Sequence, residues 1–494
     1  MKITVLTTLL LVYYTTVGLS PNSPNIVLIL TDDQGWGSTS VLMDKNVPES
    51  KSDFIQTPNL EKLAERGVIF SDAYAPHPNC SPTRYSILTG KSPAKLQMSD
   101  IVGRHSGLYF DNNRVIPPPH VNDIADEEHT LAEWIKNHRS EYVTAHFGKW
   151  HLNGGGPARH GFDTDSGPTS NREGTAKDSD PKRIFSITEK GNEWMEKQVK
   201  EERPFYLQIS HYATHLAVFS LESTLKKTEA RQPGKRHILP GHAAMTEDLD
   251  SGVGMTLDKI KELGIEDNTY VIYIADNGTY PRNNPGNTNG PLHGWKATTW
   301  EGGIRVPLLI AGPGIDHGRR STRTVGWDLF PTICDWLGIN SVPDGLEGDS
   351  LANLLLRGDS AGFVREDPIV IHFPHYQLHK GGQPSTALYH GDYKLIKFWE
   401  TGDYHLYNLE TDLDESENLS KKDTNRVVRM SNMLSDYLDK IDAGIPTLNT
   451  QFDPNNDPGA PWADIKARLI SEPYFILQDP EPNWALNPGS SRNR

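Results

Sequence analysis

Apolar runs that alternate with helix-like segments restrict the fold of this chain more than any other feature. Asn25–Leu30 (NIVLIL) and Thr269–Ala275 (TYVIYIA) are nearly continuous apolar runs, which are typical of parallel strands buried on both faces. Further strands are expected at Tyr142–Phe147, Phe205–Ser210 and Val306–Ala311. The expected helices are 57–67, Leu131–His138, Ile187–Lys200, Ala243–Leu263 and Leu329–Leu337. This alternation predicts an α/β fold with a large, mostly parallel sheet sandwiched by helices.

The first of these helices has a recognisable start and end. Thr57 is placed to cap it, Pro58 occupies its first position, and Gly67 ends it.

The pattern of apolar runs and turns in the sequence changes after about residue 360. Short apolar strands joined by turns rich in Gly and Asp are expected at Pro368–Phe373, Ser385–His390, Tyr393–Trp399 and Tyr404–Asn408, followed by a helix at Asn425–Ile441. From Pro454 the chain is rich in Pro, Asn and Asp, and we expect a surface tail with little regular structure. The sequence therefore predicts a main α/β domain over 21–360 and a smaller C-terminal α+β subdomain with an antiparallel sheet and an extended tail over 361–494.

The first twenty residues have the pattern of an export signal. Lys2 precedes an apolar run from Ile3 to Val17 that is too short for a membrane span, and small residues follow at Gly18 and Ser20. The alternative is a buried N-terminal strand or helix. We expect a signal peptide over 1–20, a secreted or periplasmic protein and no membrane attachment after cleavage. A net charge of −15 without a Lys/Arg block argues against a nucleic-acid partner.

Acidic loops follow two of the predicted buried strands. Asp32 and Asp33 end the first, and Asp276 and Asn277 end a later one. The carboxyl ends of parallel strands are where ligands gather, and a set of oxygen donors suits calcium or magnesium better than zinc. Taken singly, each pair is more often a turn or a helix cap. Together they predict a site for one metal ion.

Cys80-Ser81-Pro82-Thr83-Arg84 is the segment with the most distinctive chemistry. Pro82 suits the first turn of a helix, which would leave Cys80 at its N-terminus, where negative charge is stabilised. Arg84, one turn on, could brace residue 80. Two alternatives stay open at this point: a disulfide between Cys80 and Cys334, and a cysteine hydrolase with an adjacent general base.

The C-x-P-x-R pattern at Cys80, followed by Thr89-Gly90, resembles the signature of the type I sulfatases, members of the alkaline-phosphatase-like superfamily. The resemblance extends over roughly residues 24 to 420. It includes Asn25 to Gly35, Phe147 to His151, Ile274 to Gly278, Lys296 with Glu301 to Pro307, Asp392 to Leu395 and Leu406 to Leu409.

The resemblance implies a formylglycine made from Cys80 by a formylglycine-generating enzyme, and one bound Ca²⁺. Its metal ligands would be residue 80 with Asp32, Asp33, Asp276 and Asn277. A hydroxyl of the hydrated aldehyde would attack sulfur, with Arg84 and His151 positioning and deprotonating it. Lys149, Lys296 and His215 would hold sulfate oxygens, and His215 or Lys296 would protonate the departing sugar oxygen. Two lysines and a cation supply the electrostatic stabilisation that sulfate-ester hydrolysis needs.

Several of these assignments have competing interpretations. Lys149 and His151 are two residues apart, so on an extended segment they face the same side; otherwise they are a solvated lysine and a core histidine. His215 lies in Ala-Thr-His-Leu rather than the family's Pro-His-x-Pro, and His211 is its competitor. Trp150 and Trp300 are expected to pack rather than to bind sugar.

Substrate contacts are less well defined by the sequence. Candidates that could bind sugar hydroxyls or further sulfates are Asp100, Arg104, His105, His211, His372, His375 and Lys380. For the histidines and lysine of 372–380, a structural loop is the alternative.

The expected export and these candidate substrate contacts favour a sulfated polysaccharide or oligosaccharide as substrate, such as algal ulvan or carrageenan. Animal glycosaminoglycans are another option. The rival functions are a phosphonate or phosphodiester hydrolase of the same superfamily, a cysteine-dependent hydrolase and a non-catalytic glycan-binding relative.

Overall fold

The structure is a computed structural model of the 494-residue chain, and it describes residues 23–103, 112–171, 173–280, 289–358, 363, 365 and 367–471. The predicted signal peptide over 1–20 lies outside the described residues, as do Arg104 and His105. Within the part that is described, none of the helices combines the length and apolar character needed to cross a bilayer.

An eight-stranded sheet forms the centre of the molecule. Its spatial order is β10-β2-β9-β8-β1-β7-β5-β6. The strands are β1 Asn25–Thr31, β2 Gly67–Phe70, β5 Val143–Gly148, β6 Thr164–Asp165, β7 Phe205–Ser210, β8 Thr269–Ala275, β9 Leu308–Ala311 and β10 Gly318–Arg320. All neighbouring pairs are parallel except the two that β9 makes, with β2 and β8. The predicted α/β class with a mostly parallel sheet is confirmed.

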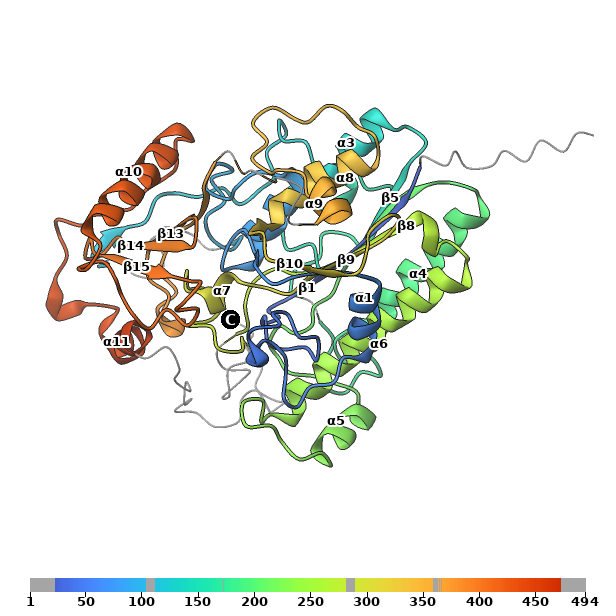
Figure 1. Ribbon diagram of the computed structural model, residues 1–494, viewed down its shortest axis with the longest axis horizontal. Coiled ribbons are helices and arrows are strands. Elements are labelled where there is room, and N and C mark those ends of the chain that lie inside the picture. Colours follow the sequence, from blue (N-terminus) through green and yellow to red (C-terminus); the bar gives the residue numbers. More distant parts are fainter. Residues whose placement is uncertain are drawn as a thin grey trace, which may run out of the picture.

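Helices cover both faces of this sheet (Figure 1). On one face lie α1 Pro58–Arg66, α4 Ile184–Lys200 and α6 Pro240–Glu262, with α5 Glu222–Glu229 packed on α6. On the other lie α2 Cys80–Thr89, α3 Leu131–His138, α8 Leu329–Trp336 and α9 Ala352–Arg357. Successive residues of β1 alternate between the two cores, Ile26 and Leu28 in one and Val27 and Ile29 in the other. A strand with apolar residues at every position is thus buried on both sides.

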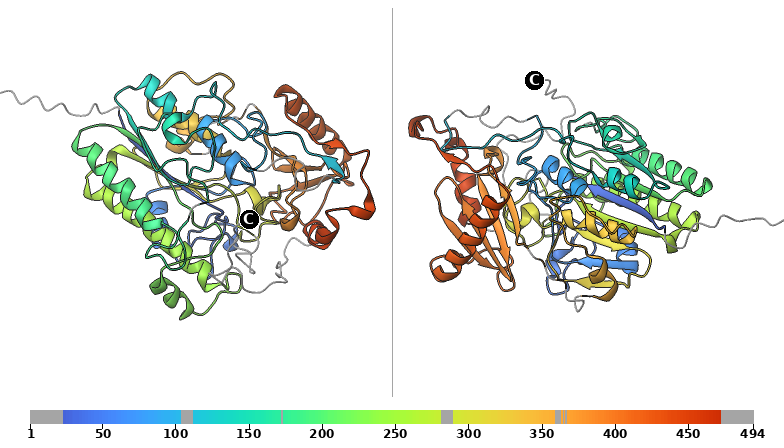
Figure 2. Two further views of the ribbon diagram at one scale, coloured as in Figure 1. Left: turned by 180° about the vertical axis from the view of Figure 1, so that it is seen from behind. Right: turned by 90° about the horizontal axis from the view of Figure 1, so that it is seen from above.

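A four-stranded antiparallel sheet forms the C-terminal subdomain. Its order is β12-β13-β14-β15, with β12 Ile369–Phe373, β13 Ser385–His390, β14 Tyr393–Phe398 and β15 Tyr404–Asn408. The helix α10 Thr424–Lys440 packs on one face, and the other face packs against the main body, as the right-hand view of Figure 2 shows. This confirms the predicted antiparallel subdomain.

Short elements complete the structure. Two-stranded sheets pair β3 Ala73–Tyr74 with β11 Thr324–Val325 and β4 Val115–Ile116 with β16 Thr447–Leu448. Further short helices among the described residues are α7 Glu301–Ile304, η1 Pro48–Ser50, η2 Pro157–His160, η3 Glu266–Asn268, η5 Gly326–Asp328, η7 Leu378–Lys380, η8 Pro454–Asn456, η9 Ala460–Trp462 and α11 Ala463–Ser471.

Two local expectations were wrong, and one alternative is excluded. The tail after Pro454 contains the helix α11, because the apolar face of Ile465 and Leu469 packs under the small sheet. Thr57 does not cap α1, because its side chain pairs with Ser40 instead. The alternative disulfide is also excluded, since Cys80 and Cys334 are both free.

Candidate active site

The nucleophile candidate Cys80 is the first residue of α2 and is fully buried. Pro82 lies in the first turn, where the sequence predicted it. Gly90 ends the helix in the left-handed region with φ 68°, and its N–H donates to the Ser86 carbonyl at 2.8 Å. Residue 80 therefore lies where the free N–H groups and the dipole of a helix N-terminus favour negative charge.

Two pairs of oxygen-bearing side chains meet at the carboxyl ends of β1 and β8. Asp32 and Asp33 follow β1, Asp276 and Asn277 follow β8, and the two strands are parallel neighbours. The Asp33 N–H donates to Asp276 Oδ1 at 3.1 Å, which ties the two loops together. One ligand atom each from Asp32, Asp33, Cys80 and Asp276 lies within 4.8 Å of the others, and all four residues are buried.

The donor atoms of this cluster fit a hard divalent cation. Asp33 Oδ2 and Asn277 Oδ1 are buried and have no hydrogen-bond partner among the described residues. Burial and the neighbouring Asp32 carboxylate raise the pKa of Asp276, the response expected where several carboxylates share one site. Carboxylate and amide oxygens suit calcium or magnesium, and the Cys80 sulfur is the one soft donor atom of the set.

A cationic side chain pairs with each carboxylate. Lys149 Nζ donates to Asp32, and Lys296 Nζ donates to Asp33 Oδ1 at 2.5 Å and to Cys80 Sγ at 3.0 Å. Burial lowers the pKa of Lys149, but the charges of Asp32, Cys80 and Asp276 together outweigh burial and the pKa is raised overall. The pKa of Lys296 is raised well above its usual value in the same way, with Asp33 as the main partner. Both lysines are therefore charged at neutral pH.

The hydrogen bonds of Arg84 connect it to Asp276 and to the Lys149 backbone. Its Nε and Nη2 atoms donate to Asp276 Oδ2 at 3.0 and 2.8 Å, and its Nη1 donates to the Lys149 carbonyl at 2.7 Å. This fork fixes the Asp276 carboxylate and the Lys149 backbone to one helix.

The segment that carries Lys149 and His151 is not extended, contrary to expectation. β5 ends at Gly148, whose φ is 100°, and His151 has φ 57°, so the chain turns between them. A Cβ on Gly148 would lie 2.0 Å from the Ser210 carbonyl oxygen, which requires glycine there. His151 is buried, and burial followed by Lys149 and Arg84 lowers its pKa well below the usual value, so its imidazole is neutral.

His215 faces the cluster and His211 does not. His215 Nε2 lies 3.9 Å from Asp33 Oδ2, and its side chain is 18% exposed. His211 is buried, and burial alone lowers its pKa to about 4 without a charged neighbour. The positions of the two rings favour His215 as the residue that meets substrate.

Residues of the C-terminal subdomain reach the turn before Cys80. Gln377 Nε2 donates to Asn79 Oδ1 at 3.0 Å and to Asp100 Oδ1 at 3.4 Å. Lys380 Nζ donates to Gln377 Oε1 at 2.8 Å and lies 4.9 Å from the Tyr280 ring centroid. Asp100 and Lys380, both predicted as substrate contacts, are thus joined through Gln377, a residue that the sequence did not single out.

The other two predicted substrate contacts of this region, His372 and His375, differ in their hydrogen bonds. His375 Nε2 pairs with Ser99 Oγ at 2.8 Å. Both ring nitrogens of His372 are engaged, with Thr386 Oγ1 at 2.7 Å and the Gly444 carbonyl at 2.9 Å, and its ring is buried. These contacts favour the structural alternative for His372.

The two tryptophans near the motifs are packed. Trp150 stacks on His160 with ring centroids 6.0 Å apart, and Trp300 stacks on His293 at 4.0 Å. Both indoles are buried, which fits the expected packing role.

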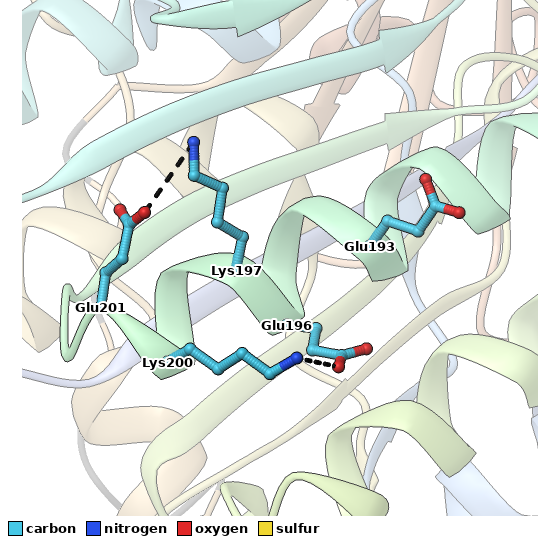
Figure 3. A pocket seen from close by; sticks show the side chains of 5 residues that line it. All are labelled: Glu193, Glu196, Lys197, Lys200 and Glu201. Carbon is cyan, nitrogen blue, oxygen red and sulfur yellow. Dashed lines mark hydrogen bonds and ion pairs between the residues drawn. The ribbon is translucent and has the colours of Figure 1, made fainter.

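A hollow on the surface of α4 lies away from this cluster (Figure 3). Ion pairs Lys200–Glu196 at 2.5 Å and Lys197–Glu201 at 3.9 Å cross it, beside Glu193. These residues lie toward the end of α4 that leads into the start of β7, whereas Cys80 and its neighbours lie at the carboxyl ends of the strands. The hollow is a solvated helix face and not the active site.

Two protein-family models match most of the chain. The family model described as Sulfatase matches residues 24–339, and the model described as N-sulphoglucosamine sulphohydrolase, C-terminal, matches residues 292–443.

Named relatives align over long stretches. The N-acetylgalactosamine-6-sulfatase of Canis lupus familiaris is 28% identical, covering 81% of this chain and 77% of that protein. The ulvan-active sulfatase of Formosa agariphila is 30% identical, covering 69% of this chain and 66% of that protein. The crystal structure of Ps i-CgsB in complex with k-i-k-neocarrahexaose superposes with a TM-score of 0.69 at 22% identity, covering 91% of this chain and 98% of that one, and it shows a shared fold.

Proposed function

The chain belongs to the sulfatase family and is a sulfuric ester hydrolase, and from this premise we propose that it removes sulfate from a sulfated polysaccharide or oligosaccharide, using formylglycine made from Cys80 and one calcium ion. The observation that carries this proposal is the mismatch between the Cys80 sulfur and the oxygen donors around it. Replacing the thiol by formylglycine would put oxygen at the one position of the cluster where a hard cation meets sulfur.

The ionisation of Cys80 supports the same conclusion. Burial raises the pKa of the thiol to about 12, so an unmodified Cys80 is neither a thiolate nucleophile nor a hard ligand at neutral pH. Among the described residues, the side chains that share a hydrogen bond with Sγ are Asp32 at 3.5 Å, Asp33 at 3.8 Å and Lys296 at 3.0 Å, none of which is an imidazole. These contacts weigh against a cysteine-dependent hydrolase, which would need an adjacent base.

The site residues divide into metal ligands, anion binders and proton carriers. Asp32, Asp33, Asp276 and Asn277 would hold the ion together with residue 80. Bound calcium supplies positive charge for the sulfate oxygens, and hydrated formylglycine supplies a hydroxyl nucleophile. Lys149 and Lys296 bind and neutralise sulfate oxygens as charge builds on them.

Two histidines serve proton transfer in this proposal. The neutral imidazole of His151 takes a proton from the nucleophile. His215, whose side chain is more exposed than that of His151, gives a proton to the departing sugar oxygen.

The names of the relatives support a glycan substrate. One relative is an ulvan-active sulfatase, one acts on N-acetylgalactosamine 6-sulfate by its name, and the structurally similar Ps i-CgsB was crystallised with a carrageenan oligosaccharide. We infer an algal polymer of the ulvan or carrageenan type as the favoured substrate. The N-terminal sequence pattern supports export, so that the protein meets the polymer in the periplasm or outside the cell.

Sulfate release is the experiment that tests this function. Protein from a host with a formylglycine-generating enzyme is incubated with ulvan, ι-carrageenan and chondroitin sulfate, and free sulfate is measured. We expect release from at least one glycan, its loss in Cys80→Ala, its loss after chelation and its return with calcium. Faster turnover of an aryl phosphodiester than of an aryl sulfate would favour the phosphodiester hydrolase. Glycan binding without sulfate release would identify a non-catalytic relative.

A further inference from the structure

Two side chains outside the motifs, Glu173 and Lys182, hold the segment that carries His215. Lys182 precedes α4 and is almost completely buried. Its Nζ donates to the His215 carbonyl at 2.8 Å and to the Ala217 carbonyl at 3.1 Å. A buried ammonium that donates to two backbone carbonyls on either side of Leu216 fixes the path of this segment.

Glu173 supplies the negative charge beside this ammonium and beside the imidazole. Its Oε1 lies 3.7 Å from Lys182 Nζ and 3.9 Å from His215 Nδ1. Burial raises the pKa of Glu173, but His215 and Lys182 outweigh burial and lower it to about 2. Glu173 is thus a carboxylate at neutral pH, close to the Nδ1 side of the ring.

The hydrogen bonds of the His215 ring define its orientation. Nδ1 lies 2.6 Å from the Leu216 carbonyl oxygen, which can only accept, so Nδ1 carries a proton. Nε2 is on the opposite side of the ring and lies 3.9 Å from Asp33 Oδ2, toward Cys80 and the metal ligands. The ring therefore lies between the Glu173 carboxylate and the cluster, with Nε2 presented to the cluster.

We propose that Glu173 and Lys182 are positioning residues that hold His215 with Nε2 directed at the leaving oxygen of the sulfate ester. This inference rests on the proposed function. The proton on Nε2 goes to the sugar oxygen, which keeps the electron pair of the broken S–O bond, and the imidazole is left neutral. Carboxylate and ammonium partners that orient a catalytic imidazole are effective because small misplacement of a proton donor is costly.

A purely structural ion pair would have a different kinetic effect. If Glu173 only stabilised the fold, its loss would reduce turnover of every substrate by the same factor. If it positions a proton donor, its loss affects esters with poor leaving groups most, since a good leaving group departs without protonation. The dependence on leaving group therefore separates the two roles.

The experiment compares two substrates on the same protein samples. One is the glycan among ulvan, ι-carrageenan and chondroitin sulfate that the wild type desulfates, and the other is 4-nitrophenyl sulfate. For Glu173→Gln and Lys182→Met we expect kcat on the glycan to fall by about 10- to 100-fold and kcat on 4-nitrophenyl sulfate by less than about 3-fold. The ratio of the two rates does not depend on the folded fraction, so partial misfolding does not obscure it.

Two further variants make the outcome specific. Glu193→Gln, an exposed glutamate in the hollow on α4, should leave both rates unchanged. In a His215→Ala background, Glu173→Gln should lower kcat no further, because Glu173 acts through the proton donor that His215→Ala has already removed.

Equal losses on both substrates, or a further loss in the His215→Ala background, would overturn the inference while the sulfatase function stands. Absence of sulfate release by the wild type from every substrate would overturn the proposed function and the inference together.

Discussion

At the scale of single residues, the site is a balanced set of buried charges. Asp32 pairs with Lys149, Asp33 with Lys296, and Asp276 with Arg84. All six side chains are at most 2% exposed, so each charge depends on its partner for stability. Arg84 differs from the lysines because its fork binds the Asp276 carboxylate with two nitrogens.

Arg84→Lys should therefore weaken metal binding. A lysine cannot reproduce the two-nitrogen contact, and the freed Asp276 carboxylate loses its fixed orientation. We expect calcium affinity, measured by isothermal titration calorimetry, to fall by about 10- to 100-fold. Arg159→Lys, at an exposed surface pair, is the matched control. Unchanged calcium affinity in Arg84→Lys would contradict the assigned role of this arginine.

Motif residues could be placed from the sequence, and their supporting residues could not. Cys80, Lys149 and Lys296 lie in segments that resemble motifs of the type I sulfatases, and this resemblance is why they could be named. Glu173 and Lys182 belong to no such pattern, because they act through backbone carbonyls and through charge on a segment far from them in the chain. Only the folded structure brings them to His215.

At the scale of elements, the start of α1 is stabilised from another helix. Asp250 of α6 accepts the Asn59 N–H at 3.0 Å and the Leu60 N–H at 2.8 Å. The side chain of Thr57, the predicted cap, is paired with Ser40. Cap preferences are local, so the sequence indicates where the helix starts but not which distant carboxylate satisfies its free N–H groups.

Stability at this helix start should depend on pH. Burial raises the pKa of Asp250 to about 6, despite its hydrogen bonds from Asn59 and Leu60. A folded-state pKa above the unfolded value means that the contribution is complete below about pH 4 and is lost as pH rises through about 6. We expect the free energy of unfolding of the wild type, relative to Asp250→Asn, to fall by about 2–3 kcal/mol between pH 4 and pH 7 in urea titrations.

The control for this experiment is Asp258→Asn, an exposed position of the same helix. A difference between wild type and Asp250→Asn that stays constant across this pH range would show that the Asp250 carboxyl is not perturbed.

At the scale of the whole molecule, a buried ion network joins the C-terminal sheet to the short helix α7 of the main body. Lys394 of β14 lies 2.9 Å from Glu301 and 2.7 Å from Glu415, and Glu415 accepts the Glu301 N–H at 2.8 Å. Glu301 begins α7, five residues after Lys296 of the active site. Alternating strands and helices predicted the large sheet, and short strands joined by turns predicted the small one. Their docking depends on residues far apart in sequence and could not be inferred from any local pattern.

Removing the central ammonium should be far more costly than removing one carboxylate charge. Lys394→Met leaves Glu415 buried without its cation and leaves Glu301 with Arg305 alone, and we expect a loss of about 3–5 kcal/mol in unfolding free energy. Burial raises the pKa of Glu415 to about 8, so its neutral form is favoured near pH 6 and Glu415→Gln should cost less than about 1 kcal/mol there. Equal costs for the two variants in denaturant titrations at pH 6 would contradict this account of the network.

The proposed chemistry depends on the chemical state of residue 80, which lies in a site built of oxygen donors. Peptide mass spectrometry across Cys80, on protein from a host with a formylglycine-generating enzyme, measures that state directly. We expect an aldehyde or its hydrate at position 80. An unmodified thiol throughout, in protein that nevertheless releases sulfate, would contradict it.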